Sequence, residues 1–378
     1  MDQTFLTPGD PAPSFVQRSP GNPRYAFDTA AGRWLVLLFL GSVADARSAA
    51  ALDAAKARAD LFNDDFASLF AVTIDPTDEA EGRIADRIPG VRHFLDFDLS
   101  VCRLYGVVSA QAERGPVALR RCWMVIDPTM RVRQVIPFAE DGADLPALFA
   151  ALEALPPPRR FAGIELQAPI LFLPDIFEPA LCARLISLYE EKGGEESGFM
   201  REVDGKTVGV SDPGHKRRKD CLIEDEPLLG AIRQRFVRRV VPQIAKAHQF
   251  AVTRMERYIV ACYAAEDGGH FRAHRDNTTK GTAHRRFAVS INLNAEFEGG
   301  EISFPEYGPR SFKPPPGAAV VFSCSLLHAV SRVTSGRRYA FLPFLYDDAA
   351  AALRERNLQF LAEAGAAQEA PERATEGS

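Results

Sequence analysis

The stretch GGHFRAHRDN, residues 268–277, places two histidines and an aspartate within ten residues, and it decides how the second half of the chain is interpreted. His270 and His274 are four residues apart, a spacing that would put both on one face of a helix. His274 and Asp276 are two apart, which puts both on the same side of a β-strand. The adjacent glycines disfavour a helix, and Phe271 stands where a helical metalloprotease motif needs glutamate. We therefore expect a His-x-Asp pair on a strand.

A His-x-Asp pair needs a third ligand before it specifies a metal site, and His328 in VVFSCSLLHAV (320–330) is the candidate. Two histidines and one carboxylate on one face of Fe(II) leave three coordination positions open. Two of these can take a bidentate 2-oxo acid, and the third can take O2. The second carboxylate of such an acid needs a cation, and Arg338 can bind it with two parallel hydrogen bonds. Arg337 is the alternative if the register is off by one.

The patterns around these residues predict a β-rich fold. From about residue 254 the chain reads as successive strands, with turns at EGG (298–300) and PPPG (314–317). Two helical patterns precede them, one in residues 177–192 and one from Pro227 to Pro242, where proline kinks or divides the run. Helices followed by many strands favour a barrel or sandwich with helical buttresses.

The first half of the chain has a different texture. WLVLLFL (34–40) and SLFAVTIDP (68–76) are typical of buried strands, and the alanine-rich residues 46–62 between them are typical of a helix. Such alternation favours an α/β layer structure. Three consecutive prolines in LPPPRRFAG (155–163) favour an extended spacer. We therefore expect four parts: an α/β domain (1–155), a proline-rich linker (156–168), a β-rich domain (169–347), and a tail that is first helical and then disordered (348–378).

Bulk composition limits the possible partners. A length of 378 residues points to two domains, and a net charge of −5 with a pI of about 5.9 disfavours nucleic-acid binding. The first residues do not form a signal peptide, and the apolar runs are too short to span a bilayer. The six scattered cysteines contain no CxxC pair, which fits a reducing compartment. We expect a cytoplasmic protein that binds neither nucleic acid nor membrane.

Residues from about 170 to 347 resemble the Fe(II)- and 2-oxoglutarate-dependent oxygenases, in particular the prolyl 4-hydroxylase-like branch. The resemblance is carried by ACYAAEDGGHFRAHRDN, RRFAVSINLN, EGGEISFP, PPPGAAVVFSCSLLHAV and GRRYAFLPFLY. It implies a double-stranded β-helix, a jelly-roll or cupin-like fold, with Fe(II) bound by His274, Asp276 and His328.

The same resemblance implies how the co-substrate is bound. Arg338 would bind the far carboxylate of 2-oxoglutarate, and Tyr263 would hydrogen-bond the same molecule. Asn292 occupies a position where relatives often carry a tyrosine. The implied reaction is hydroxylation of a C–H bond by O2, with decarboxylation of 2-oxoglutarate to succinate and with ascorbate as a reductant. Asp276 favours hydroxylation over halogenation, because halogenating relatives replace this carboxylate.

The resemblance leaves the substrate open among a peptidyl proline, a free amino acid and a small metabolite. An alternative function is a non-catalytic sensor that binds iron and 2-oxoglutarate and uses the first domain for protein partners.

The N-terminal half resembles the peroxiredoxin branch of the thioredoxin fold in PGDPAPSF, WLVLLFL, VTIDP, CRLYGV and LRRCWMVIDPTMRV. A peroxidase of this family carries its reactive cysteine in the turn after the strand that corresponds to WLVLLFL. This chain has GSVADARS (41–48) there, with no cysteine. Peroxide chemistry needs a thiolate nucleophile, so it should be absent. Arg121 matches the arginine that the family places beside that thiol. We expect a docking or scaffolding module; a peroxidase using Cys102 is the alternative.

The remaining polar clusters are interpreted as structural. These are His93, His215, His248, His270 and His284, together with the basic run HKRRKD (215–220). Such a run is usually a solvated face. The alternative is a flexible lid over the iron site that attracts an acidic substrate.

Overall fold

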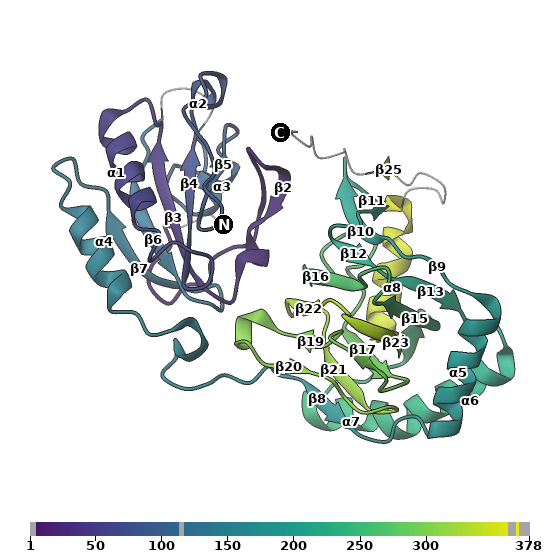
Figure 1. The fold of residues 1–378 in the computed structure, drawn as a ribbon. Coiled ribbons are helices and arrows are strands. Elements are labelled where there is room, and N and C mark those ends of the chain that lie inside the picture. Colours follow the sequence, from purple (N-terminus) through teal and green to yellow (C-terminus); the bar gives the residue numbers. More distant parts are fainter. Residues whose placement is uncertain (1–4, 113–116, 362–367, 370–378) are drawn as a thin grey trace. The chain divides into compact units, whose positions relative to one another are not determined.

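The computed structural model describes residues 5–112, 117–361 and 368–369. The chain forms two compact units, one of Met1–Ala168 with Pro305–Pro309 and one of Pro169–Phe304 with Arg310–Ser378. Figure 1 draws the first mainly in purple and blue and the second in teal, green and yellow. None of the helices in the described part of the chain has the length and apolar character needed to cross a bilayer.

The first unit is built on a mixed sheet of five strands in the order β5-β4-β3-β6-β7. Strands β3, β4 and β5 are parallel, and β6 and β7 add antiparallel neighbours beside β3. The sheet strands are β3 (Trp34–Gly41), β4 (Ala67–Thr73), β5 (Val91–Leu95), β6 (Cys122–Ile126) and β7 (Val132–Pro137). The other elements are β1 (Val16–Ser19), β2 (Asn22–Ala26), α1 (Ala46–Ala57), α2 (Pro76–Ala80), α3 (Ser100–Leu104) and α4 (Asp144–Glu153).

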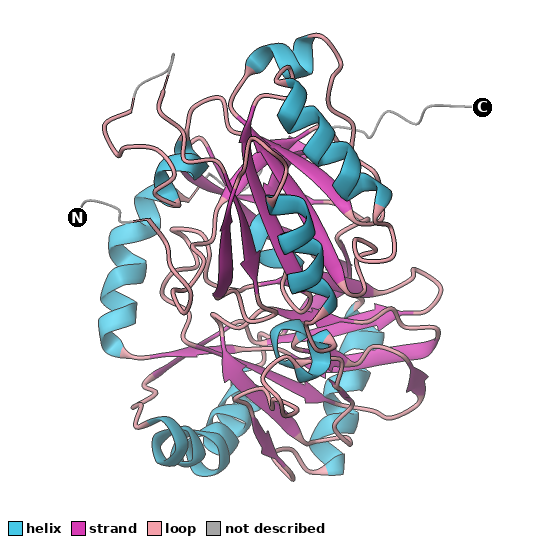
Figure 2. Ribbon diagram, turned by 90° about the vertical axis from the view of Figure 1, so that its left-hand side faces the viewer, coloured by secondary structure: helices cyan, strands magenta, loops and turns pink. Residues whose placement is uncertain are grey.

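Strand β3 is continuously apolar because both of its faces are buried. One face, with Trp34 and Leu38, packs on α1 and α4 through residues such as Leu52 and Leu148. Figure 2 shows helices lying over the strands in this way. The predicted α/β layer is present in this unit.

The second unit is rich in short strands, as the sequence predicted. Its larger sheet follows the order β14-β24-β17-β23-β15-β13-β9, and its smaller sheet the order β12-β16-β22-β19-β20. The strands of the larger sheet, with the attached β8, β18 and β21, are β8 (Leu171–Leu173), β9 (Glu195–Glu196), β13 (Lys219–Leu222), β14 (Arg254–Glu256), β15 (Ile259–Ala264), β17 (Phe287–Asn292), β18 (Phe297–Glu298), β21 (Ala319–Ser323), β23 (Ser335–Phe341) and β24 (Phe344–Tyr346). Those of the smaller sheet are β12 (Lys216–Arg217), β16 (His270–His274), β19 (Ile302–Ser303), β20 (Ser311–Phe312) and β22 (His328–Val330). A further small sheet contains β10 (Phe199–Val203), β11 (Lys206–Ser211) and β25 (Gln368–Glu369).

Helices cover the outer face of the larger sheet. They are α5 (Pro179–Lys192), α6 (Glu226–Arg235) and α7 (Val241–His248). The apolar run predicted from Pro227 onwards is buried, and it is divided into α6 and α7. A π-helical segment, Phe236–Val240, joins the two helices, and Pro242 lies in the first turn of α7.

The two-residue period of the strands assigns side chains to the two faces of the larger sheet. On β15, Val260 and Cys262 belong to the core beneath the helices, whereas Tyr263 packs with residues of the smaller sheet such as Phe271 and Val330. The same alternation turns polar residues of β17 and β23 away from the helices. The interior between the sheets is therefore where polar side chains can gather.

The tail begins with the predicted helix, α8 (Asp348–Asn357), capped by Asp347, whose side chain accepts a hydrogen bond from the backbone N–H of Ala350. The predicted disorder falls largely on residues 362–367 and 370–378, which lie outside the described residues.

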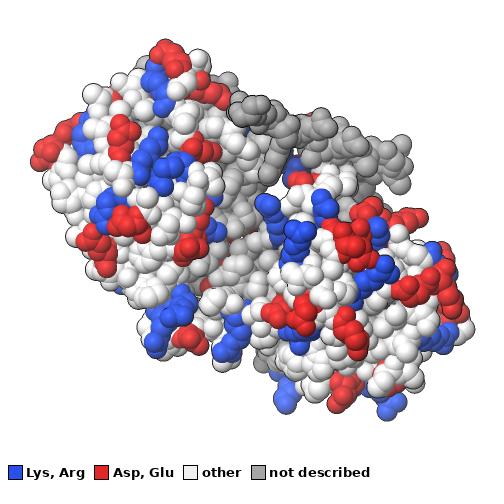
Figure 3. Space-filling view, in the orientation of Figure 1, with Lys and Arg blue, Asp and Glu red and all other residues white. Residues whose placement is uncertain are grey.

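On the face of the molecule drawn in Figure 3, acidic and basic side chains are interspersed.

Candidate active site

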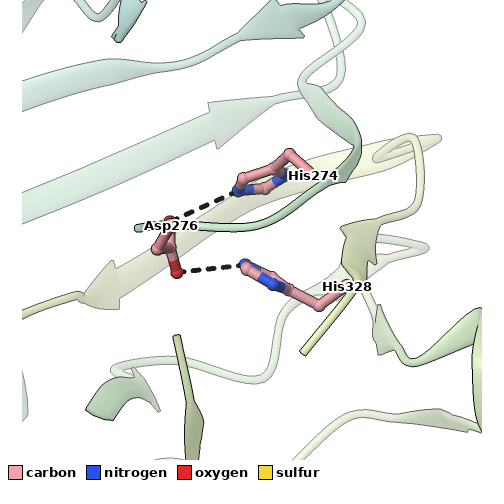
Figure 4. A group of neighbouring side chains, drawn as sticks. All are labelled: His274, Asp276 and His328. Atoms are coloured by element: carbon pink, nitrogen blue, oxygen red, sulfur yellow. Dashed lines mark ion pairs between the residues drawn. The ribbon is translucent and has the colours of Figure 1, made fainter. Parts of the chain in front are cut away.

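Three side chains converge at one edge of the smaller sheet: His274, Asp276 and His328 (Figure 4). His274 ends β16 and pairs directly with His328, the first residue of the antiparallel strand β22. Their potential ligand atoms all lie within 4.8 Å of one another. Nε2 of His274 is 3.6 Å from Oδ1 of Asp276, and Nε2 of His328 is 3.4 Å from Oδ2. Ligands about 2.1 Å from one metal ion and at right angles to each other are about 3 Å apart, so this spacing suits a single ion.

Asp276 is not on the strand, contrary to the prediction. Strand β16 ends at His274, and Asp276 lies in the turn that follows. Its backbone N–H donates to the carbonyl oxygen of Cys324, 3.0 Å away. This hydrogen bond ties the turn to the segment that leads into β22, so the carboxylate reaches the two histidines without strand geometry.

The hydrogen bonds of the two imidazoles fit a metal site. Nδ1 of His274 lies 2.7 Å from the carbonyl oxygen of Arg272, and Nδ1 of His328 lies 3.0 Å from that of Leu326. A carbonyl only accepts, so each Nδ1 carries a proton, which leaves Nε2 as the ring nitrogen that can face a metal. Such partners commonly orient histidine ligands. Burial and the neighbouring His274 lower the pKa of His328 to about 4, which keeps this imidazole neutral at pH 7, as a ligand must be.

The carboxylate of Asp276 is held in its charged form. Burial would raise its pKa, but His328, His274 and Arg285 outweigh burial and hold the pKa well below its usual value. The side chain is 12% exposed. A carboxylate oxygen beside two imidazole nitrogens is the donor set that a non-haem Fe(II) site uses, so the residues present fit this ion.

Arg338 is buried inside the larger sheet with part of its hydrogen-bonding capacity unused. It is 1% exposed, its Nε donates to Oδ1 of Asn292 at 2.9 Å, and its Nη2 donates to Oγ of Ser290 at 2.8 Å. Among the described residues, none accepts a hydrogen bond from Nη1. Burial lowers the pKa of this guanidinium, yet arginine stays protonated in proteins. Arg337 instead lies half-exposed and pairs with Glu266.

The structure brings Tyr263 and Asn292 to Arg338. Tyr263 pairs with Arg338 across β15 and β23, and the guanidinium carbon lies 5.2 Å from the ring centroid. Asn292 accepts from Arg338 through its side-chain oxygen and donates through Nδ2 to the carbonyl of Pro314, 2.8 Å away. In this chain Asn292 is therefore an acceptor that orients the arginine.

The basic run at 215–220 is neither a solvated face nor a lid, and that interpretation was wrong. Its residues form β12 and begin β13, and Lys216 and Arg218 are each only 6% exposed. Arg218 donates from Nη1 to the hydroxyl of Tyr263 at 3.3 Å and from Nη2 to Oδ2 of Asp220 at 2.7 Å. This arginine is therefore buried, and the carboxylate of Asp220 compensates its charge.

Ser290 and Arg218 were not among the predicted site residues. Ser290 stands two residues before Asn292 on β17, so the strand period could have placed it on the same face. Arg218 and Asp220 are also two residues apart, so a strand would place them on the same face. The run of basic residues around them favoured a solvated surface instead. The other histidines have structural partners where the structure records them: His284 contacts Glu256 and His93 contacts Asp86.

Comparison with known proteins shows the family to which the chain belongs. The model of the 2OG-Fe(II) oxygenase superfamily matches residues 258–346. A PKHD-type hydroxylase of Paracoccus denitrificans is 30% identical over 177 residues, which cover 41% of this chain and 75% of that protein. A PKHD-type hydroxylase of Shewanella baltica is 26% identical over 163 residues, covering 40% of this chain and 70% of that protein.

Solved structures that resemble the chain include a prolyl hydroxylase from Trichoplax adhaerens in complex with a peptide fragment of hypoxia inducible factor. Its TM-score is 0.40 at 18% identity, covering 50% of this chain and 87% of that one. A prolyl-4-hydroxylase of Pseudomonas putida gives a TM-score of 0.36 at 16% identity, covering 48% and 93%.

The chain belongs to the 2OG-Fe(II) oxygenase superfamily. It is an oxidoreductase of the prolyl hydroxylase-like type, a hydroxylating dioxygenase that uses Fe(II), 2-oxoglutarate and O2.

Proposed function

We propose that His274, Asp276 and His328 hold the iron of this dioxygenase, and that Arg338 binds the far carboxylate of 2-oxoglutarate. Bound Fe(II) would use O2 to hydroxylate a C–H bond, with 2-oxoglutarate oxidised to succinate and CO2 at the same time. The chain's own residues hold and orient these groups. The two Nδ1–H groups fix the rings, and Asp276 contributes the negative charge.

The observation that carries the proposal is the pairing of a three-ligand cluster with a buried, partly unused guanidinium in one β-rich unit. The unused Nη1 of Arg338 is a buried donor, and leaving a buried charged donor unpaired is costly. A carboxylate would satisfy it. Asn292 and Ser290 hold the guanidinium by its Nε and Nη2 sides.

The test is Fe(II)-dependent conversion of 2-oxoglutarate to succinate under O2, together with iron content after reconstitution. We expect His274→Ala and Asp276→Ala to lose iron and succinate formation. His270→Ala is the matched control, because His270 begins the same strand but is not part of the cluster of potential metal ligands. Undiminished turnover in His274→Ala would contradict the ligand assignment. Tight binding of iron and 2-oxoglutarate without O2 consumption would favour a sensor.

For the substrate we propose a peptidyl proline, a free amino acid or a small metabolite. Incubating a cell extract with the enzyme and searching by mass spectrometry for the gain of one oxygen distinguishes the three. A modified tryptic peptide would assign the first class and a modified small molecule one of the others.

We propose that residues 1–155 form a peroxiredoxin-like thioredoxin fold without peroxidase activity that docks a protein partner, followed by the linker 156–168, the oxygenase domain 169–347 and the tail. The mixed sheet beneath α1 and α4 supports the fold. Arg121 is paired with Asp45 and Glu140 and is therefore not poised beside a thiol. All six cysteines are free and buried, which supports a cytoplasmic, reducing location.

A further inference from the structure

Tyr263 lies between two buried guanidiniums, and only one of them belongs to the proposed co-substrate site. The carbon Cζ of Arg338 is 5.2 Å from the centre of the tyrosine ring, and that of Arg218 is 5.7 Å from it. Tyr263 is 1% exposed. The three side chains come from neighbouring parts of the larger sheet, because β15 pairs with both β13 and β23 and Arg218 immediately precedes β13.

The hydrogen bond between Arg218 and Tyr263 has a fixed direction. Nη1 of Arg218 donates to the tyrosine oxygen at 3.3 Å, and a guanidinium has no acceptor to receive a proton in return. The tyrosine hydroxyl must therefore direct its own hydrogen elsewhere. Among the described residues, none accepts it. The Tyr263 hydroxyl thus has an unused hydrogen, and Nη1 of Arg338 is an unused donor as well.

Arg218 is itself held rigidly. Its Nη2 donates to Oδ2 of Asp220 and to Oγ of Ser197, and its Nε lies 2.7 Å from Oδ1 of Asp220. Ser197 also donates to Asp220, and Arg257 donates to the same carboxylate at 2.8 Å. An arginine fixed by a carboxylate in this way has little freedom to move away from Tyr263.

The buried side chains around Tyr263 carry more positive than negative charge. Arg218 and Arg257 share the one carboxylate of Asp220, and none of the described carboxylates contacts Arg338. Buried cations need compensation. A dianion such as 2-oxoglutarate supplies it, whereas a neutral ligand does not.

We propose that Arg218, held by Asp220, is a positioning residue for the co-substrate: it orients the hydroxyl of Tyr263 so that this group donates to 2-oxoglutarate bound at Arg338. Arg218 acts through Tyr263. This inference rests on the proposed function, since it needs the co-substrate at Arg338.

The test is calorimetric titration of 2-oxoglutarate into the Fe(II)-loaded full chain without O2, compared with the steady-state KM and kcat. We expect Tyr263→Phe and Arg218→Gln each to weaken binding by roughly tenfold or more, the usual effect of losing a hydrogen bond to a charged group. The double variant should be little weaker than either single variant, because both changes remove the same contact. KM for 2-oxoglutarate should rise while kcat changes less.

The control is Arg217→Gln, which removes a neighbouring exposed arginine that contacts the main-chain carbonyls of Pro213 and Asp267. If Arg218→Gln does not fold, Arg218→Lys takes its place in the test. It keeps a cation next to Asp220 and should retain part of the affinity for 2-oxoglutarate. Wild-type affinity in Tyr263→Phe, or fully multiplicative losses in the double variant, would overturn the proposal. If Arg338→Ala binds like the wild type, the proposed function fails instead.

Discussion

His274 and His328 lie directly opposite each other on the antiparallel strands β16 and β22, with ring centroids 4.2 Å apart. This one register pair brings together two of the proposed metal ligands, which are far apart in the sequence. A slip of one residue would turn one of the rings to the other side of the sheet. The pairing, together with the turn that carries Asp276, is what makes the three side chains a site.

Replacing Arg338 should separate its role from that of its neighbour. We expect Arg338→Ala to weaken 2-oxoglutarate binding on the order of a hundredfold, because a buried charge pair is lost. Arg337→Ala should change it little, since Arg337 is half-exposed and pairs with Glu266. Calorimetric titration measures both. Equal losses in the two variants would show that the assigned register is wrong.

Substitutions of Asn292 test whether its side-chain oxygen orients Arg338. Asn292→Ala should weaken 2-oxoglutarate binding about tenfold, because Nε of Arg338 loses its partner. Asn292→Asp should weaken it more, because the new carboxylate would pair with the guanidinium and compete with the co-substrate. Asn294→Ala is the control, since Asn294 hydrogen-bonds main-chain atoms of Arg337 and Tyr339 and not the guanidinium of Arg338. Tighter binding in Asn292→Asp would contradict this geometry.

Acid should weaken the fold through Glu256. Burial would raise its pKa, but the hydrogen bond with His284 and the charge of Arg285 lower it to about 2. Because the folded pKa lies below the unfolded one, the carboxylate stabilises the fold above about pH 4.5, and this contribution is lost as the pH falls toward 2. In metal-free protein, the difference in unfolding free energy between wild type and Glu256→Gln should shrink by roughly 2 kcal/mol between pH 7 and pH 3.

Urea unfolding at the two pH values measures this change, and the exposed Glu191→Gln is the control. A difference that stays constant with pH would show that Glu256 has no such role.

The thiols should be inert in the native protein. All six cysteines are buried, and burial raises the pKa of Cys122 to about 12 and holds that of Cys102 above its usual value. A thiol-modifying reagent should therefore label none of them before unfolding and all six afterwards. Peroxide-dependent oxidation of native Cys102 would instead support the peroxidase alternative.

Local patterns were enough to name His274, Asp276 and His328 as candidate ligands and to predict a β-rich second half. The spacing of His274 and Asp276, the later His328 and the succession of short strands are all visible in a single sequence. The two-residue period predicts that only one of Arg337 and Arg338 faces the interior, but only the structure shows that the buried one is Arg338.

Tertiary structure decided which polar side chains meet. Strand pairing is non-local, so only the fold shows that Ser290 and Asn292 lie against Arg338, or that Tyr263 lies between two arginines. The basic run was misinterpreted for the same reason: composition predicts contact with water, whereas Arg218 is buried against Asp220. Whether a charge is solvated or paired depends on partners that the chain brings from elsewhere.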